Sequence, residues 1–372
     1  MDLERLRTVF ETPGPYLTLH VDVSRNNENA AEQVESRWTS IRHELERAAI
    51  PDSLVPEIDE RIHENTHVQG EVRRTIVAAA DRILLDDVQA GHNPHPEVVD
   101  VADLPDLAPW IDIEDQAYPF VLAVVDRTGG EVSAYRAASQ EPVDEETVTG
   151  ATYYITKVPE GDWAQKQFQQ TAENRWHENA ELVAEAVRSA ALADRARAVL
   201  VAGEVRARAE VVRAVESLDH GFDGVIEIES GGRAEGASEE ALWGEVHEKL
   251  RQLVAAEDAD VAARLDQGRG RGEGVATGID EVLGALVKGQ VEQLVVDLAA
   301  LAEKSVKPGQ YDGLPLPASA ADADELPADR VLVAAAALTG ADLTVLPASM
   351  AHGGGASALL RWDDSTKSGS EV

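Results

Sequence analysis

Few residues in this sequence are arranged in a pattern that could carry out chemistry. His92 and His95 have the spacing of a metal-ligand pair, but no third ligand stands nearby, so we expect a loop there and no metal site. Glu204 directly follows a short apolar run, which makes it either a catalytic carboxylate or the residue that caps the following helix. The GxSxG pattern of serine hydrolases is absent from the chain.

The glycine-rich segments do not predict a nucleotide site. Every second residue of 268–274 is glycine, but this spacing matches neither GxGxxG after a strand nor GxxxxGK[ST]. We therefore expect segment 266–274 to be a flexible hinge between domains. The run His352-Gly353-Gly354-Gly355 precedes an expected strand and is followed by no helix, so it predicts a turn. No cofactor is expected.

Composition restricts the class of protein. The chain has 372 residues, a length that fits two to three domains, and it contains no cysteine. Thiolate catalysis, cysteine zinc sites and disulfide frameworks are thereby excluded. The first residues lack the pattern of a signal peptide, and no apolar run approaches the ~18–20 residues of a membrane span. We expect a cytoplasmic protein with no membrane contact.

The chain is strongly acidic, with 69 Asp and Glu against 33 Lys and Arg and a formal net charge of −36. Charge of this size repels itself in dilute buffer, but molar salt shortens the Debye length to about 3 Å and screens it. We interpret the acidity as adaptation to a salty cytoplasm. The alternative is a protein-interaction module that avoids polyanions, because binding to phosphates normally requires clusters of Lys and Arg.

The pattern of apolar residues predicts a mixed α/β chain of three blocks. In the first block, residues 16–23 alternate as a strand, whereas residues 32–49 and 69–84 place apolar residues at helical spacing. The domains expected are an α+β domain at 1–115, an α/β domain at 116–265 and an αβα domain at 273–362. The polar residues 363–372 are expected to be a disordered tail.

The two later blocks alternate strands with helices, which favours α/β domains. Their predicted strands are 120–126, 131–136, 198–202, 224–228, 291–297, 341–346 and 356–362. Their predicted helices are 165–191, 239–264, 277–287 and 329–338.

Five segments, in this order, resemble the archaeo-eukaryotic class-1 release factor and Pelota family. They are Tyr118–Asp126, Gly161–Gln170, Val201–Arg206, Gly274–Leu286 and Ala358–Trp362. The similarity is closest to the actinobacterial-type branch that is related to the ribosome hibernation factor Balon. It implies a release-factor-like middle domain and a C-terminal domain similar to ribosomal protein L7Ae.

The sequence departs from this family at the residues that carry its chemistry. Release factors place Gly-Gly-Gln before a helix, and the two glycines allow backbone geometries closed to other residues. The corresponding residues are Gly161-Asp162-Trp163, and no Gly-Gly-Gln occurs elsewhere in the chain. Ordinary peptide release is therefore not expected. Gln165 is a weak candidate for a displaced catalytic glutamine.

The resemblance implies that this degenerate loop and the helix after it contact the ribosome. Trp163 would stack on a nucleobase or pack locally under the helix, and Lys166 and Arg175 would contact phosphates or face solvent. The whole predicted contact segment consists of Gly161, Asp162, Trp163, Ala164, Gln165, Lys166, Gln167, Phe168 and Arg175.

The resemblance implies a non-catalytic factor that binds the ribosomal A site in hibernation or stress. The alternative that it implies is a peptidyl-tRNA hydrolase for release or rescue that uses Gln165. The implied partners are 16S and 23S RNA and elongation factor Tu, with no DNA and no metal.

Overall fold

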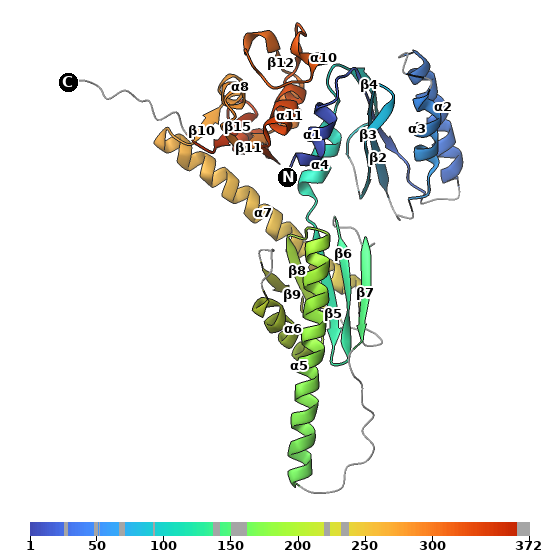
Figure 1. Ribbon diagram of the computed structural model, residues 1–372, viewed down its shortest axis with the longest axis vertical. Coiled ribbons are helices and arrows are strands. Elements are labelled where there is room, and N and C mark those ends of the chain that lie inside the picture. Colours follow the sequence, from blue (N-terminus) through green and yellow to red (C-terminus); the bar gives the residue numbers. More distant parts are fainter. Residues whose placement is uncertain are drawn as a thin grey trace, which may run out of the picture. The chain divides into compact units, whose positions relative to one another are not determined.

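The computed structural model describes residues 1–25, 29–47, 51, 53–66, 71–91, 94–136, 142–149, 162–218, 224–231 and 238–362. For Ala30 and residues 162–174 only the backbone is described. Contacts divide the chain into two compact units, one made of Met1–Gln116 with Ala256–Val372 and the other of Ala117–Ala255. The chain has the predicted mixed α/β class (Figure 1). No helix among the described residues is both long and apolar enough to cross a bilayer.

The unit of Ala117–Ala255 is built around one five-stranded sheet in the order β7-β6-β5-β8-β9. Its elements are β5 (Phe120–Asp126), β6 (Gly129–Tyr135), β7 (Asp144–Thr149), α5 (Asp162–Ala193), β8 (Ala198–Gly203), α6 (Val205–Ser217), β9 (Val225–Glu227) and the first half of α7 (Glu239–Arg271). β5, β8 and β9 run parallel, whereas β6 and β7 complete the sheet as antiparallel strands. The strands and the long helix predicted for this part of the chain are present, whereas β7 was not predicted because its residues are mostly polar and exposed.

The sheet is apolar on both faces because helices cover both. In β5, Val121 and Val125 pack with α5 and α6, whereas Phe120 and Leu122 pack with Trp243 and other residues of α7. A strand covered on both sides reads as a continuous apolar run, which is the pattern of residues 120–125. The sheet therefore forms the middle layer of an α/β/α arrangement (Figure 1).

The other unit contains two four-stranded sheets. The first, in the order β3-β2-β1-β4, is antiparallel throughout. Its elements are α1 (Glu4–Phe10), β1 (Tyr16–Asp22), α2 (Ala30–Arg47), α3 (Leu54–His63), β2 (Val72–Ala79), β3 (Arg82–Ala90), β4 (Val98–Ala102) and α4 (Ala108–Gln116). One face packs on α2 and α3, and the opposite face packs on α1 and α4.

The second sheet of this unit has the order β10-β15-β11-β14, with β11 and β14 parallel. Its main elements are β10 (Val275–Thr277), α8 (Ile279–Val287), β11 (Val291–Val296), α9 (Leu298–Ala302), α11 (Ala328–Thr339), β14 (Asp342–Val345), α12 (Ala348–Ala351) and β15 (Ala356–Leu360). The connection between α9 and α11 holds β12 (Ser305–Val306), η1 (Pro308–Gln310), α10 (Ala318–Ala321) and β13 (Leu326–Pro327). The three predicted domains remain a prediction. Contacts divide the chain into two units, with divisions after Gln116 and inside α7, after Ala255.

The helix predicted over residues 69–84 is wrong, because this segment forms strand β2 and the start of β3. Val72, Ile76 and Ala79 happen to be spaced as on a helix face. The segment is also rich in β-branched residues, which favour a pleated and buried surface. β2 pairs on both sides, with β1 and with β3, so its whole length lies within the sheet.

The flexible hinge predicted over residues 266–274 is also wrong, because α7 continues to Arg271. Gly268 is helical, and a Cβ added there would lie only 2.4 Å from Cγ1 of Val275. Gly272, with φ of +71°, ends the helix in the left-handed conformation, and its N–H donates to the carbonyl of Gly268. These glycines let the chain reverse tightly at the end of a helix. The predicted tail at 363–372 lies outside the described residues.

Candidate functional site

The predicted contact segment lies at the start of the long helix α5. Gly161 lies outside the described residues, Asp162 is the first helical residue, and Trp163, Ala164, Gln165, Lys166, Gln167 and Phe168 follow in the first two turns. The helix predicted after the degenerate triplet is therefore present. Only the backbone of these residues is described, so the roles of their side chains stay predictions.

Most of α5 that precedes Asn179 extends past the end of its sheet. Its 32 residues correspond to a helix of about 48 Å at 1.5 Å per residue. Among its described side chains, burial begins at Asn179 and Ala180 and continues to Ala191. Figure 1 shows the first half of the helix continuing beyond the strands. Arg175, partly buried, stands where the projecting half meets the half that packs.

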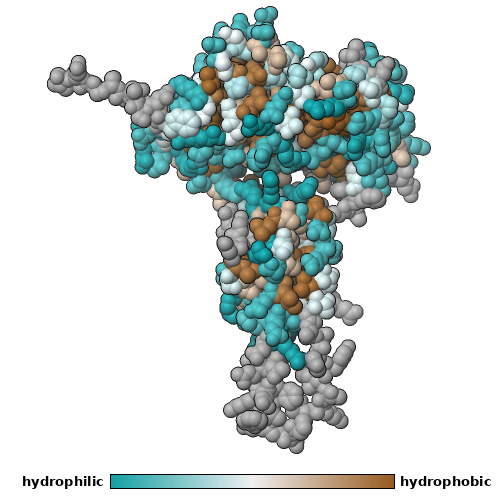
Figure 2. All heavy atoms as spheres, viewed as in Figure 1, coloured by the Kyte–Doolittle hydropathy of each residue, from teal (hydrophilic) through white to brown (hydrophobic). Residues whose placement is uncertain are grey.

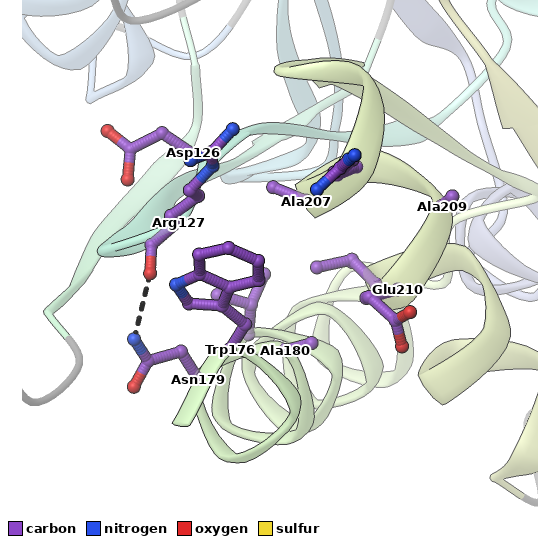
Figure 3. A pocket seen from close by; sticks show the side chains of 11 residues that line it. Asp126, Arg127, Trp176, Asn179, Ala180, Ala207, Ala209 and Glu210 are labelled. Atoms are coloured by element: carbon purple, nitrogen blue, oxygen red, sulfur yellow. Dashed lines mark hydrogen bonds between the residues drawn. The ribbon is translucent and has the colours of Figure 1, made fainter. Parts of the chain in front are cut away.

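A cavity of about 440 Å³ lies at this junction, between α5 and the start of α6 (Figure 3). We call it the α5–α6 cavity. α5 contributes residues at helical spacing, Trp176, Asn179, Ala180 and Val183, and β5 closes one side with Asp126 and with Arg127, the residue after it. Because β5 and β8 are parallel, the cavity lies beside the carboxyl ends of both strands. In α/β sheets this edge is where ligands commonly bind.

Arg127 organises the wall of the cavity. Its guanidinium carbon lies 4.8 Å from the centre of the Trp176 ring, within the range of a cation–π interaction. Nε of Arg127 also donates to Oε1 of Glu204 at 2.6 Å. The amide of Asn179 donates to the backbone carbonyl of Arg127 at 3.0 Å (Figure 3). Arg127 thus contacts the indole ring directly, and its bonds to Glu204 and Asn179 hold Arg127 in place.

Glu204 is the N-cap residue of α6, which is one of the two roles that the sequence left open for it. Its side chain makes no capping hydrogen bond to the helix, however, and pairs with Arg127. Asp126 is held by a different contact, since Oδ1 accepts from both the N–H and the hydroxyl of Thr128 at 2.6 Å. Neither carboxylate is placed as an isolated general base, so the geometry gives no support to a catalytic Glu204.

The charged residues of α6 near the cavity differ in how they are paired. Glu210 accepts from Arg213 at 2.8 Å, and Nδ1 of His177 lies 3.7 Å from its carboxylate. Arg208 is buried and bound to Glu227 and to the carbonyl of Ile228. Arg206 lines the cavity and is exposed.

No group of metal ligands forms among the described side chains. His92 lies outside the described residues, and His95 pairs with Asp112 at 2.9 Å. The sequence also contains the HExxH pattern of zinc proteases at residues 63–67, which escaped the sequence-based prediction. The pattern needs both histidines on one helix, but α3 ends at His63 and Glu64 has extended backbone angles. Both ring nitrogens of His63 contact carboxylates, those of Asp59 and Glu35.

Sequence reasoning missed the α5–α6 cavity. Trp176, Asn179, Ala180 and Val183 recur at the spacing of one helix face, which is a usable signal for a shared surface. Arg127 is separated from them by about 50 residues, and nothing local indicates that it lies over the Trp176 ring. Only the packing of α5 against β5 brings the two segments together.

Comparison with known proteins finds one family model that is similar to part of this chain. Residues 119–271 match the model of bacterial archaeo-eukaryotic release factor family 2. The uncharacterized protein Rv2629 of Mycobacterium tuberculosis is 29% identical over 383 residues, which span 100% of this chain and 99% of that protein.

Solved structures show likeness at low identity. Archaeoglobus fulgidus Pelota is 13% identical, with a TM-score of 0.30 over 97% of this chain and 92% of its own. Saccharomyces cerevisiae Dom34, a translation termination-like factor, is 10% identical, with a TM-score of 0.43 over 78% and 79% of the two chains. The match to the family model agrees with the predicted resemblance over residues 119–271.

Proposed function

We propose that this chain, a bacterial-type relative of the archaeo-eukaryotic release factors and Pelota, is a ribosome-associated factor that binds the A site without hydrolysing peptidyl-tRNA. The observation that carries the proposal is a family match over residues 119–271 in a sequence with no Gly-Gly-Gln. The matched region contains Gly161-Asp162-Trp163 where the motif is expected. The proposed setting is hibernation or stress, in the cytoplasm.

The backbone at this segment supports a non-hydrolytic role. A catalytic Gly-Gly-Gln depends on backbone angles that only glycine adopts easily. Asp162 and Trp163 are instead the first residues of an α-helix. Asp162 would also bring a negative charge toward ribosomal RNA. We therefore do not propose that this loop positions water against the ester of peptidyl-tRNA.

The proposed binding mode follows the order of the domains. The middle domain would direct the start of α5 toward the peptidyl-transferase centre and 23S RNA, and the N-terminal domain would lie near the decoding centre and 16S RNA. We include elongation factor Tu as a partner and an L7Ae-like C-terminal domain as expectations of the same family. The acidic surface is compatible with RNA contact at molar salt, where local arginines matter more than net charge.

Co-sedimentation with 70S ribosomes at molar KCl tests the proposal. The wild-type chain should sediment with vacant or stationary-phase ribosomes, and Trp163→Ala should weaken binding about tenfold, because base stacking contributes ~1–3 kcal/mol. Trp362→Ala is the matched control, since Trp362 is 51% exposed and lies outside the segment. Absence of sedimentation with every class of ribosome would overturn the proposal and leave an acidic interaction module.

A hydrolysis assay separates this function from a peptidyl-tRNA hydrolase. We expect no release of peptide from ribosome-bound peptidyl-tRNA by the wild-type chain. Turnover that is lost in Gln165→Ala but kept in Gln170→Ala would show instead that a displaced glutamine is catalytic. The second variant removes the same side chain five residues further along the same helix, outside the predicted contact segment.

A further inference from the structure

The α5–α6 cavity has no role in the function proposed above. Its volume of about 440 Å³ falls within the range of roughly 300–1,000 Å³ that is typical of small-ligand pockets. It lies in the unit formed by Ala117–Ala255, and both its apolar and its polar walls come from described residues. Three features of those walls indicate which kind of ligand they suit.

The first feature is an aromatic wall that is held in place before a ligand arrives. Trp176 is only partly buried, so part of its indole faces the cavity. The contacts of Arg127 with the ring and with Glu204 restrain it. A restrained indole costs little ordering entropy when a flat molecule packs on it, and flat heteroaromatic rings such as nucleobases gain most from such contact.

The second feature is a cation at the rim of the cavity. Arg206 stands in the first turn of α6, and its guanidinium has no ion-pair partner among the described side chains. Arg208 and Arg213 on the same helix are both paired. The side chain of Glu204 does not cap α6, so the polar N–H groups of the first turn receive no side-chain acceptor there. An anionic group, above all a phosphate, suits this position.

The third feature is the set of acceptors on the remaining walls. Asp126 and Glu210 place carboxylates at the cavity, which suits the exocyclic amino groups of a base better than a second anionic group. Figure 3 shows Glu210 on the α6 side of the cavity and Asp126 on the β5 side, with Trp176 between them. A flat ring with amino groups and a single phosphate matches all three features.

We propose that the α5–α6 cavity binds one nucleotide, with its base against Trp176 and its phosphate at Arg206. The nucleotide is either a free mononucleotide or one unit of a single-stranded RNA. This inference goes beyond the proposed function, because the isolated chain is sufficient to test it and no ribosome takes part.

Calorimetric titrations with AMP and with adenosine, at one fixed KCl concentration, test the phosphate contact. Arg206→Ala should weaken AMP about tenfold and leave adenosine nearly unchanged, because only AMP carries the group that Arg206 contacts. Arg251→Ala removes the same charge from a strongly exposed position on α7, which covers the opposite face of the sheet, and should change neither affinity. Trp176→Leu, which keeps an apolar side chain, should weaken both ligands.

The source of the nucleotide is read from a third titration, with a short single-stranded oligoadenylate. Binding of AMP that depends on Arg206 identifies a mononucleotide site. Binding of the oligonucleotide alone, with the same dependence on Arg206, identifies a site for one unit of an RNA chain. No binding of either probe, or equal affinity in wild type and Arg206→Ala, overturns the inference, whatever the ribosome experiments show.

Discussion

Asp258 on α7 should make the stability of the larger unit depend on pH. Burial, together with the nearby carboxylates of Asp115 and Glu257, raises the pKa of Asp258 from its ordinary 3.8 to about 6. The charge of Asp115 is fixed in place, because its Oδ2 accepts from the N–H of Val345 at 2.7 Å. We predict that Asp258→Asn stabilises the protein at neutral and alkaline pH.

The size of this effect follows from the shift. A rise from 3.8 to about 6 corresponds to an upper limit of about 3 kcal/mol at 1.36 kcal/mol per unit. Asp258 is only partly buried, so solvent and salt reduce the expected effect to about 1 kcal/mol. The folded state holds this proton more tightly than the unfolded state. The contribution of Asp258 is therefore present below its ordinary pKa and is lost as pH rises through about 6.

Denaturant unfolding at about pH 5 and about pH 8, at constant KCl, measures the prediction. Both values lie above the isoelectric point of about 4.5, so the chain keeps its negative charge. Asp258→Asn should be more stable than wild type by about 1 kcal/mol at the higher pH and by clearly less at the lower one. Asp260→Asn, at an exposed neighbouring position, is the matched control. An equal gain from the control, or a gain that does not change with pH, would refute the reasoning.

Three further substitutions test the packing in denaturant unfolding. Gly203→Ala should lower the free energy of unfolding by about 3 kcal/mol or prevent folding, because φ is +117° and the new Cβ would lie 2.0 Å from the carbonyl oxygen of Val125. An unchanged free energy of unfolding would contradict this tight contact. Arg74→Ala should lower the free energy of unfolding by about 3 kcal/mol, because Asp86 loses a buried partner at 2.6 Å. Adding Asp86→Ala should recover part of that loss. Trp243→Ala should cost about 3–5 kcal/mol, since the ring is 5% exposed, and an unchanged midpoint would show that the face it covers is not packed.

The sequence predicted the unit of Ala117–Ala255 well, and the reason is physical. The run Phe120–Val125 is apolar at every position because helices cover both faces of its strand, and its short length and flanking turn residues favour a strand over a helix. The strand Val72–Ala79 is also covered by helices on both faces, but this segment was predicted as a helix. Its apolar residues fit both the helical period of 3.6 residues and the strand period of 2, and only its pairing with β1 and β3 decides between a helix and a strand.

The candidate site was less predictable than the fold. The helix after Gly161 follows from its periodicity, but the α5–α6 cavity depends on which residues meet across the sheet. The stacking of Arg127 on Trp176 joins segments that no local pattern relates. The glycines of 268–274 were predicted as a flexible hinge, but Gly268 packs closely on Val275 within the helix and Gly272 ends the helix with a positive φ.

The order of the strands along the chain has a consequence for synthesis on the ribosome. In the sheet β10-β15-β11-β14, the strand made last, β15, lies between two strands made earlier. The unit that contains it also begins at the other end of the chain and is interrupted by Ala117–Ala255. The interrupting unit is continuous, so it can fold once its own residues have emerged, whereas α1 must wait for about 320 further residues until α11, on which it packs, is made. The apolar side of α1 that packs on α11 therefore stays uncovered for most of synthesis, and the acidic composition behind the net charge of −36 helps to keep the nascent chain from associating meanwhile.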